Sequence, residues 1–266
     1  MTVARIFGSL FDAMQSRSGS QNATARLSSR DVATEDAPEG GGLEGFETPE
    51  AQAINKARLD HLDSLGLPLD GRTVLDVGSG PGHLAQYFVA RGCDVLSTDA
   101  REENVRRLQE LYPGHQADTI DVERDSLDAL GRFDVVFCYG LLYHLESPVL
   151  ALRKLASVCD DLLLVETMVC DSPLPVLRLE DEYLSLNQAL RGIAHRPSPA
   201  WVAMVLDRIG MHNVYLAAEP PAHPDYRFDR LHGLETARDG HLLRAVFVAS
   251  WNALDNDRLV PLVAPE

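Results

Sequence analysis

One short stretch, Val74 to Gly82, constrains the fold of this chain more than any other. Its first four residues are mostly apolar, which is typical of a buried strand, and they lead into a turn with glycine at every second position. An amphipathic segment, His83 to Arg91, follows and predicts a helix. Backbone N–H groups of such a turn and of a helix N-terminus can face a ligand, and glycines let that ligand approach the main chain closely. The order strand, glycine turn, helix therefore predicts a ligand site.

Strand-like and helix-like segments alternate after this turn, which is typical of an α/β fold. Because the strands are almost continuously apolar, we expect a doubly wound sheet covered by helices on both faces, a three-layer sandwich. The last two strand-like runs have no helical period between them and are expected to pair antiparallel. The expected strands span residues 73–77, 95–98, 116–120, 133–138, 162–165, 213–217 and 244–250.

Three expected helices share the same start signal, an N-cap residue followed by proline at the first helical position. The pairs are Thr48-Pro49, Ser147-Pro148 and Ser198-Pro199. A fourth, more polar helix is expected from Glu102 to Tyr112.

The composition divides the chain into an extension, one domain and a tail. Residues 1–42 are rich in Ser, Ala, Gly and Arg and are expected to be mostly disordered, with a possible short amphipathic helix near their start. The other expected boundaries are a domain at 43–251, insertions in it at 167–197 and 220–241, and a C-terminal tail at 252–266.

The charge balance limits the partners of the protein. Its 24 Lys and Arg residues face 40 Asp and Glu residues, for a net charge of −16. Such a field repels polyanions, so we expect small-molecule or protein partners rather than nucleic acid. No apolar run reaches the roughly 20 residues that a membrane span needs.

The cysteine and histidine spacings indicate neither disulfides nor a metal. The four cysteines are scattered without a C-x-x-C pair, which is typical of free thiols in a reducing compartment, and we expect a cytoplasmic protein. His223, Asp225, His232 and His241 crowd one loop, but their spacing matches no metal-binding template, so no metal site is expected.

The spacing of the glycines separates two classes of ligand. Dinucleotide-binding turns follow G-x-G-x-x-G, and His83 stands where the third glycine would fall. This disfavours an oxidoreductase that binds NAD or FAD. The form Asp-x-Gly-x-Gly-x-Gly, starting at Asp76, instead resembles the cofactor motif of the class I methyltransferases that depend on S-adenosylmethionine (SAM).

Later segments strengthen this resemblance. Asp99 follows the second strand, where the family has an acid that accepts the ribose hydroxyls, and Asp121-Val122 follows the third, where the family contacts adenine. Tyr139 to Leu145 resembles the loop that borders both cofactor and acceptor. The resemblance implies SAM as cofactor and a seven-stranded sheet of order 3-2-1-4-5-7-6 with the last strand antiparallel. The cofactor-binding residues it implies are Asp76, Gly78, Ser79, Gly80, Gly82, Asp99, Ala100, Asp121, Val122 and Tyr139.

His144 is the candidate catalytic base, because it lies just past the fourth strand and the ordinary pKa of histidine suits proton removal near neutral pH. The alternative is a structural histidine that anchors the loop through a backbone hydrogen bond. Tyr143 and Glu166, which is expected at the end of the fifth strand, are second choices. Methyl transfer itself mainly requires alignment of nucleophile, methyl group and sulfur.

The acceptor is expected to be a small molecule, with O-methylation favoured. The segment Leu141 to Ala156 resembles the branch of tRNA wobble-uridine carboxymethyltransferases and their uncharacterised relatives, which keeps a tRNA-modifying enzyme as an alternative. The basic RNA-binding extension of those tRNA enzymes is replaced here by an acidic body. A SAM-binding module without turnover is the other alternative. Acceptor contacts are expected from the helix that precedes the first strand and from the two insertions, which contain Tyr183, Asn187, Gln188, Arg191, His195, Tyr226 and Arg227.

Overall fold

The structure is a computed structural model that describes residues 43–182, 184, 187–227 and 236–262. The expected disorder and short helix of residues 1–42, and the candidate contact Tyr183, lie outside these ranges. No helix in the described ranges is both long and apolar enough to cross a membrane.

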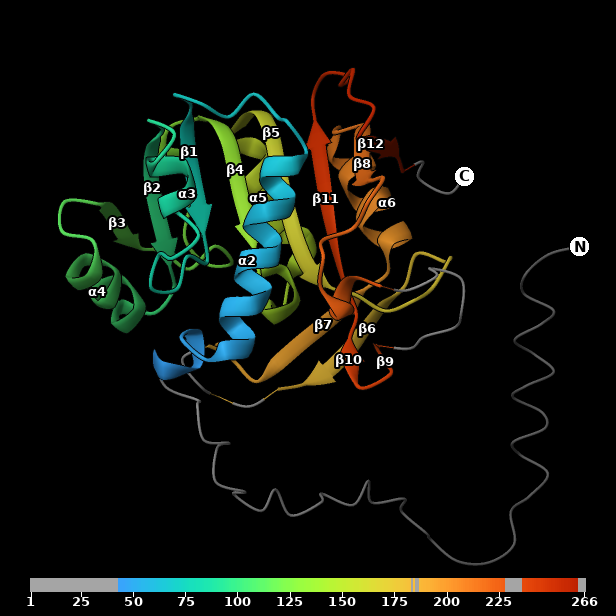
Figure 1. Cartoon of the computed structure of the whole chain (residues 1–266), viewed down its shortest axis with the longest axis horizontal. Coiled ribbons are helices and arrows are strands. Elements are labelled where there is room, and N and C mark those ends of the chain that lie inside the picture. Colours follow the sequence, from blue (N-terminus) through green and yellow to red (C-terminus); the bar gives the residue numbers. More distant parts are fainter. Residues whose placement is uncertain (1–42, 183, 185–186, 228–235, 263–266) are drawn as a thin grey trace, which may run out of the picture. The chain divides into compact units, whose positions relative to one another are not determined.

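A mostly parallel sheet forms the centre of the domain (Figure 1), in the order β12-β8-β11-β5-β4-β1-β2-β3. Its first seven strands in sequence have the predicted order, and β11 runs antiparallel to both β5 and β8 as predicted. An eighth strand, β12, pairs with β8 and lies in the segment expected to be a tail. The strands are β1 Thr73–Val77, β2 Asp94–Asp99, β3 Gln116–Thr119, β4 Phe133–Tyr139, β5 Cys159–Met168, β8 Asn213–Ala217, β11 Arg244–Ser250 and β12 Leu259–Pro261.

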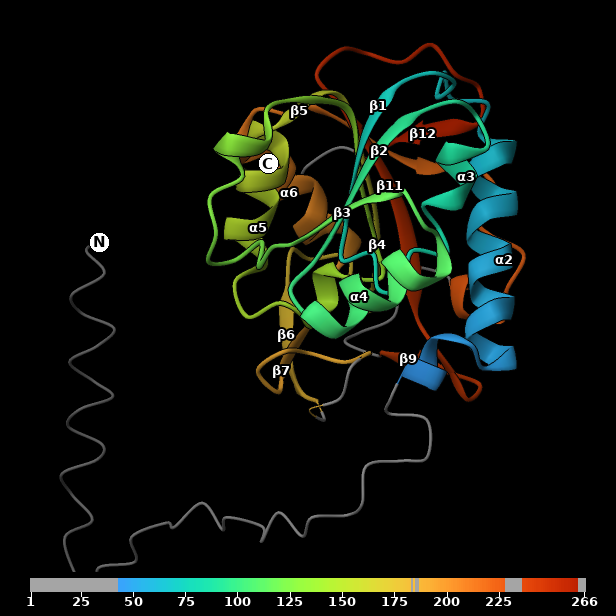
Figure 2. The same cartoon turned by 90° about the vertical axis from the view of Figure 1, so that its left-hand side faces the viewer.

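Helices cover both faces of this sheet and complete the predicted three layers (Figure 2). Helices α2 and α3 pack on one face through Leu62 and Phe88, and α5 and α6 pack on the other through Leu152 and Leu206. All four of these side chains are fully buried. The helices are α2 Pro49–Ser64, α3 Gln86–Val89, α4 Glu102–Leu111, α5 Pro148–Ser157 and α6 Pro199–Ile209, with 3₁₀ turns η1 Leu43–Phe46, η2 Asp128–Leu130, η3 Leu142–His144 and η4 Pro224–Tyr226.

All three helices predicted from an N-cap residue and proline begin at that proline. In two of them the N-cap side chain accepts a backbone N–H of the first turn, as expected. Thr48 accepts the N–H of Ala51 at 3.1 Å, and Ser198 accepts that of Trp201 at 3.1 Å. Ser147 makes no such bond through its side chain; its own N–H donates to Glu123 instead.

The helix expected at 83–91 is shorter than predicted, because only Gln86–Val89 is helical. The residues before it form tight turns, in which the N–H of Tyr87 bonds to the carbonyl of Leu84, three residues back. The glycine turn therefore leads into a bend before the helix begins.

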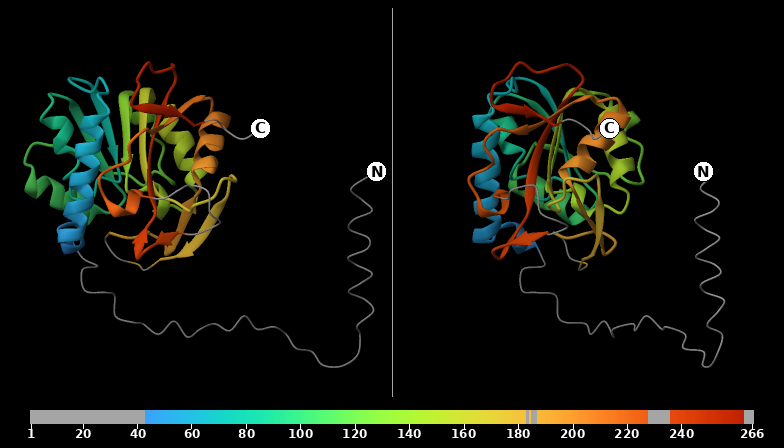
Figure 3. Two further views of the ribbon diagram at one scale, coloured as in Figure 1. Left: turned by 45° about the vertical axis from the view of Figure 1, so that its right-hand side comes forward. Right: turned by 90° about the vertical axis from the view of Figure 1, so that its right-hand side faces the viewer.

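Two small antiparallel pairs were not predicted and lie beyond the carboxyl ends of the parallel strands (Figure 3). The first insertion contains β6 Leu177–Asp181 and β7 Ile193–Pro197, and the second contains β9 Ala237–Arg238 and β10 His241–Leu242. The β6–β7 hairpin brings the residues after β6 to the ligand edge of the sheet.

Candidate active site

The glycine turn between β1 and α3 is held close to its neighbours. The N–H groups of Gly78 and Ser79 donate to the carbonyl of Thr98 at 2.8 and 3.0 Å, which ties the turn to β2. Gly78 has a φ of +72°, and a Cβ on it would stand 2.8 Å from Leu141. Since a side chain cannot fit there, the turn presents bare backbone to the cavity beside it.

Asp99 lies at the end of β2, on the wall of that cavity. One carboxylate oxygen accepts the N–H of Gly80 at 2.9 Å; the other accepts the N–H of Arg101 at 2.9 Å and the amide of Asn104 at 3.1 Å. Burial raises the pKa of Asp99, and these N–H donors offset part of that rise. The carboxylate is thus fixed in one orientation next to the glycine turn.

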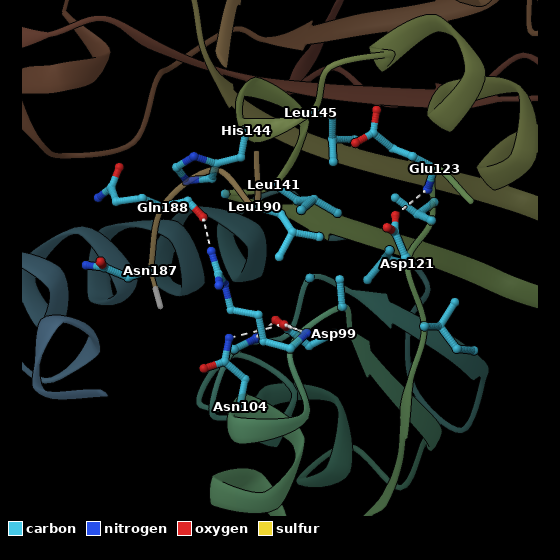
Figure 4. Close-up of a pocket in the computed structure, with 18 of the residues that line it drawn as sticks. Asp99, Asn104, Asp121, Glu123, Leu141, His144, Leu145, Asn187, Gln188 and Leu190 are labelled. Carbon is cyan, nitrogen blue, oxygen red and sulfur yellow. Dashed lines mark hydrogen bonds between the residues drawn. The ribbon is translucent and has the colours of Figure 1, made fainter. Parts of the chain in front are cut away.

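The first cavity has about 690 Å³ of empty space, which includes solvent at its opening. Figure 4 shows Asp99 and Asn104 at one end of it, Asp121 and Glu123 at one side, and His144 across from Asp99. The predicted cofactor residues that line it are Gly78, Gly80, Asp99, Ala100, Asp121 and Val122. The acids after β2 and β3 therefore meet at one cavity, as their positions in the sequence predicted.

Residues of the first insertion close this cavity over Asp121. The guanidinium of Arg191 pairs with Asp121 and, at 2.9 Å, with Glu123. Arg101 donates to the backbone carbonyl of Gln188 at 3.3 Å, which attaches the insertion to the loop after β2. Arg191, which was expected to contact the acceptor, lines the first cavity and not the second.

Asp76 and Gly82, also predicted to bind the cofactor, line neither this cavity nor the next one. Asp76 is buried behind the turn, where it accepts the hydroxyl of Ser97 at 3.0 Å, and burial raises its pKa to about 7. A Cβ on Gly82 would stand 2.6 Å from Leu108 of α4, so this glycine permits helix packing.

A second cavity, with about 870 Å³ of empty space, adjoins the first. Gly78, Gly140 and His144 line both cavities, so they mark the passage between them. Ser79, Tyr139 and Tyr143 of the predicted set line the second cavity, together with Arg58 and Arg244, which the sequence did not single out. Among the described residues, the Nε atom of Arg58 and the hydroxyl of Tyr139 are buried without a hydrogen-bond partner. Both residues line the second cavity, so these two polar atoms lie in its wall.

Glu166 is fully buried beneath this cavity and is not at the end of its strand, because β5 runs on to Met168. It accepts from Arg58 at 2.5 Å, from Arg244 at 3.2 Å and from the hydroxyl of Tyr226 at 2.8 Å. Burial alone would raise the pKa of Glu166, but the two guanidinium groups outweigh it and lower that pKa. Its place as a candidate base was wrong, since it lines neither cavity and its oxygens are committed to these partners.

His144 stands in the 3₁₀ turn after β4, at the passage between the cavities. Its Nδ1 atom lies 2.5 Å from Oε2 of Glu182, which follows β6 in the first insertion. Burial lowers the pKa of His144 below its ordinary value, and the carboxylate of Glu182 offsets part of this. At neutral pH the ring is therefore uncharged.

The other residues predicted to contact the acceptor do not all lie at the cavities. Asn187 and Gln188 line both cavities, whereas Nδ1 of His195 donates to the carbonyl of Leu145 at 2.7 Å and supports the loop. His223 and His241 flank Asp225 at 3.7 and 3.4 Å, and His232 is outside the described ranges. No cluster suited to a metal ion occurs among the residues that the structure describes.

The sheet order, the glycine turn and the acids after β2 and β3 together define the fold of class I methyltransferases, whose methyl donor is SAM. A model described as a methyltransferase domain matches residues 50–214, which is more than half of the chain. The chain belongs to this methyltransferase-domain family.

Two kinds of enzyme are found among its similar sequences. The tRNA U34 carboxymethyltransferase of Haemophilus influenzae is 34% identical over 157 residues, covering 55% of this chain and 47% of that protein. The ubiquinone biosynthesis O-methyltransferase of Bordetella avium is 34% identical over 110 residues, covering 40% and 46%. The chain thus spans about half the length of the curated relatives it matches.

Similar solved structures show the fold. The N-terminal domain of EvdMO1, crystallised in the presence of S-adenosylhomocysteine (SAH) and D-fucose, has a TM-score of 0.57 at 20% identity, covering 76% of this chain and 84% of that one. Magnesium protoporphyrin IX methyltransferase from Synechocystis PCC 6803, crystallised with bound SAM, has a TM-score of 0.50 at 19% identity, covering 91% of each chain.

Proposed function

We propose that this protein transfers the methyl group of SAM to an oxygen of a small-molecule acceptor, with His144 as the base. The observation that carries the proposal is the position of His144, an uncharged and largely buried imidazole that lines both the cavity with the acidic strand ends and the cavity beside it. A base at this passage can face an acceptor next to the cofactor's methyl group.

The residues present fit SAM, which supplies an activated methyl group on a sulfonium. Asp99 is the proposed acceptor for the ribose hydroxyls, and Asp121 with Val122 borders the proposed adenine position in the first cavity. We assign the amino-acid end of SAM to the passage at Gly78 and Gly140. Arg58, whose Nε atom has no partner among the described residues, is then the proposed cation for its carboxylate.

The chain's contribution to the chemistry is alignment and proton removal. Alignment of a nucleophile with a reacting group can supply up to roughly 7–11 kcal/mol. A positioned general base adds about 10²–10⁴-fold. The position of His144 at the junction of the two cavities supports that role, and Tyr143, whose ring centroid is 3.9 Å from that of His144, is proposed to shape the acceptor side.

A small acceptor is favoured by the net charge of −16 and by the similarity to the ubiquinone biosynthesis O-methyltransferase. The 34% identity to the tRNA U34 carboxymethyltransferase, over 157 residues, supports a tRNA acceptor as the second candidate. All four cysteines are free, which supports the cytoplasmic location that we propose.

Calorimetry tests the cofactor assignment. The protein should bind SAM and SAH and should not bind NAD, and Asp99→Asn should weaken SAH binding because it removes one charged acceptor. Binding of NAD without SAM would contradict the proposal. Binding of SAM without methyl transfer to any acceptor would instead indicate a SAM-binding module.

A further inference from the structure

We propose that Glu182 is a positioning residue for His144 and that the group methylated is a hydroxyl. The inference rests on the function proposed above and makes its acceptor more specific. Glu182 lies between β6 and β7, in an insertion whose strands are separate from the central sheet. Its Oε2 atom is 2.5 Å from Nδ1 of His144, so the hairpin supplies part of the reaction site.

The carboxylate of Glu182 is itself held in place. Oε2 also accepts the N–H of Ala189 at 2.9 Å, and the guanidinium of Arg196 lies 3.7 Å from Oε1. Burial alone would raise the pKa of Glu182, but the contacts with His144, the N–H of Ala189 and the charge of Arg196 together outweigh it, so its pKa is lowered. An ionised Glu182 can only accept, which means that Nδ1 carries the proton of the ring.

With the proton on Nδ1, the lone pair of the neutral ring is on Nε2. In the part of the chain that the structure describes, the imidazole of His144 hydrogen-bonds only through Nδ1, to Glu182. The side chain lines both cavities, so its unused nitrogen is available at their junction. The arrangement of carboxylate, imidazole and open nitrogen is the one required to orient a general base.

The charged groups around His144 decide how readily it takes a proton. Glu182 faces it from the insertion, Arg196 from β7 and Arg244 from β11, and Tyr143 precedes it in its own turn. Because the guanidinium groups of Arg196 and Arg244 are both positively charged, they disfavour an added positive charge on His144. Glu182 is the group that stabilises the imidazolium, and without it proton transfer to His144 is disfavoured.

The proton has to come from the acceptor. As the acceptor oxygen bonds to the methyl carbon, the bond from that carbon to sulfur breaks, its electron pair stays on sulfur, and the hydroxyl proton passes to Nε2 of His144. A carboxyl group is already ionised at neutral pH and has no proton to give. The dyad is therefore useful for a hydroxyl acceptor, whose proton must be removed, and not for a carboxylate.

The first experiment observes His144 directly and needs no acceptor. In full-length protein with ¹⁵N-labelled histidine and saturating SAH, long-range ¹H–¹⁵N spectra report the tautomer of each ring, and His144→Asn identifies the signal. We expect the Nδ1–H form in the wild type. A predominant Nε2–H form would overturn the proposal, since the nitrogen facing the cavity would then have no lone pair.

The second experiment compares Glu182→Gln with a matched control, Asp181→Asn. Asp181 ends β6, is exposed, and its substitution removes the same charge from the neighbouring position. Methyl transfer from labelled SAM into an extract of cellular small molecules is measured against pH. Glu182→Gln should lower the plateau rate at least about tenfold, which is a part of the roughly 10²–10⁴-fold that a general base supplies.

The pH profile separates positioning from mere folding. Loss of the Glu182 carboxylate removes the influence that raises the pKa of His144, so the midpoint of the rate profile should move to lower pH, while SAH affinity and the unfolding midpoint stay unchanged. Asp181→Asn should match the wild type. An unchanged plateau and midpoint in Glu182→Gln would overturn the positioning role.

The third measurement identifies the methylated group. Labelled product is treated with alkali, which releases methanol from a methyl ester and leaves a methyl ether intact. Stable label excludes a methyl ester, and mass spectrometry of the stable product then locates the methyl group. A methyl group on a former hydroxyl oxygen supports the proposal, whereas volatile label or a methyl group on nitrogen or carbon overturns it. Absence of any labelled product, with SAH still bound, would contradict the proposed function instead, and the tautomer spectra would still decide the role of Glu182.

Discussion

Replacing Gly82 by alanine should destabilise the protein through a clash that can be isolated by a control. Gly82 has a φ of +81°, and an added Cβ would stand 2.6 Å from Cγ and 2.7 Å from Cδ1 of Leu108, which is fully buried. Gly92 has a similar φ of +72°, but nothing lies within 4 Å of the Cβ position. Both substitutions therefore share the backbone cost, and only Gly82→Ala adds a clash.

The magnitudes follow from these two terms. A left-handed backbone costs an alanine about 1–2 kcal/mol, which both variants incur. Overpacking of a buried site costs about 1–3 kcal/mol more, and it applies at Gly82 alone. The free energy of unfolding, measured with urea, should therefore be lower in Gly82→Ala than in Gly92→Ala by about 1–3 kcal/mol.

The clash should also reach the cofactor site. Leu108 and Asn104 share one face of α4, and Asn104 donates to Asp99 at 3.1 Å. A displaced α4 would disturb Asp99, so Gly82→Ala should weaken SAH binding and Gly92→Ala should not. Equal unfolding free energies and equal SAH affinities in the two variants would refute the packing role assigned to Gly82.

The remaining predictions concern His144 and Glu166. His144→Ala should lower turnover about 10²–10⁴-fold with SAH affinity nearly intact, as measured by labelled methyl transfer and calorimetry; unchanged turnover would remove the base role. Glu166→Gln should cost about 3–5 kcal/mol in urea unfolding at pH 7, because two buried guanidinium groups lose their carboxylate, and a loss below 1 kcal/mol would contradict this. The folded-state pKa of Glu166 is below its ordinary value of 4.5, so its contribution is present above that pH and is lost as the pH falls towards the folded-state pKa. Wild type should therefore lose more stability than Glu166→Gln between about pH 5 and pH 3, and parallel curves would argue against it.

The central sheet could be predicted because its signals are local. Apolar runs gave the strands, and the bounds of β1, β8 and β11 agree with the expectation at both ends. Asp99 and Asp121 could be placed together because parallel strands bring their carboxyl ends to one edge. In contrast, β6 is mostly exposed, and only its first four residues, Leu177 to Glu180, alternate between apolar and polar, which was too short a pattern to be identified as a strand.

The missed site residues depend on contacts that no local pattern encodes. Glu182 reaches His144 from 38 positions away, and Arg58 meets Glu166 across 108 positions. Glu182 adjoins the predicted contact Tyr183, so the sequence pointed to the insertion but not to the residue in it that contacts His144. Asp76 was assigned to the cofactor because the motif contains it. In the structure its buried carboxylate accepts the hydroxyl of Ser97 in β2.

Methyl transfer into a size-separated cell extract tests the central claim most directly. The purified protein is incubated with labelled SAM and extract, and the label is measured separately in the small-molecule and RNA fractions, with His144→Ala in parallel. We predict label in the small-molecule fraction, stable to alkali and strongly reduced in the variant. Label confined to RNA, or equal labelling by both proteins, would contradict the account.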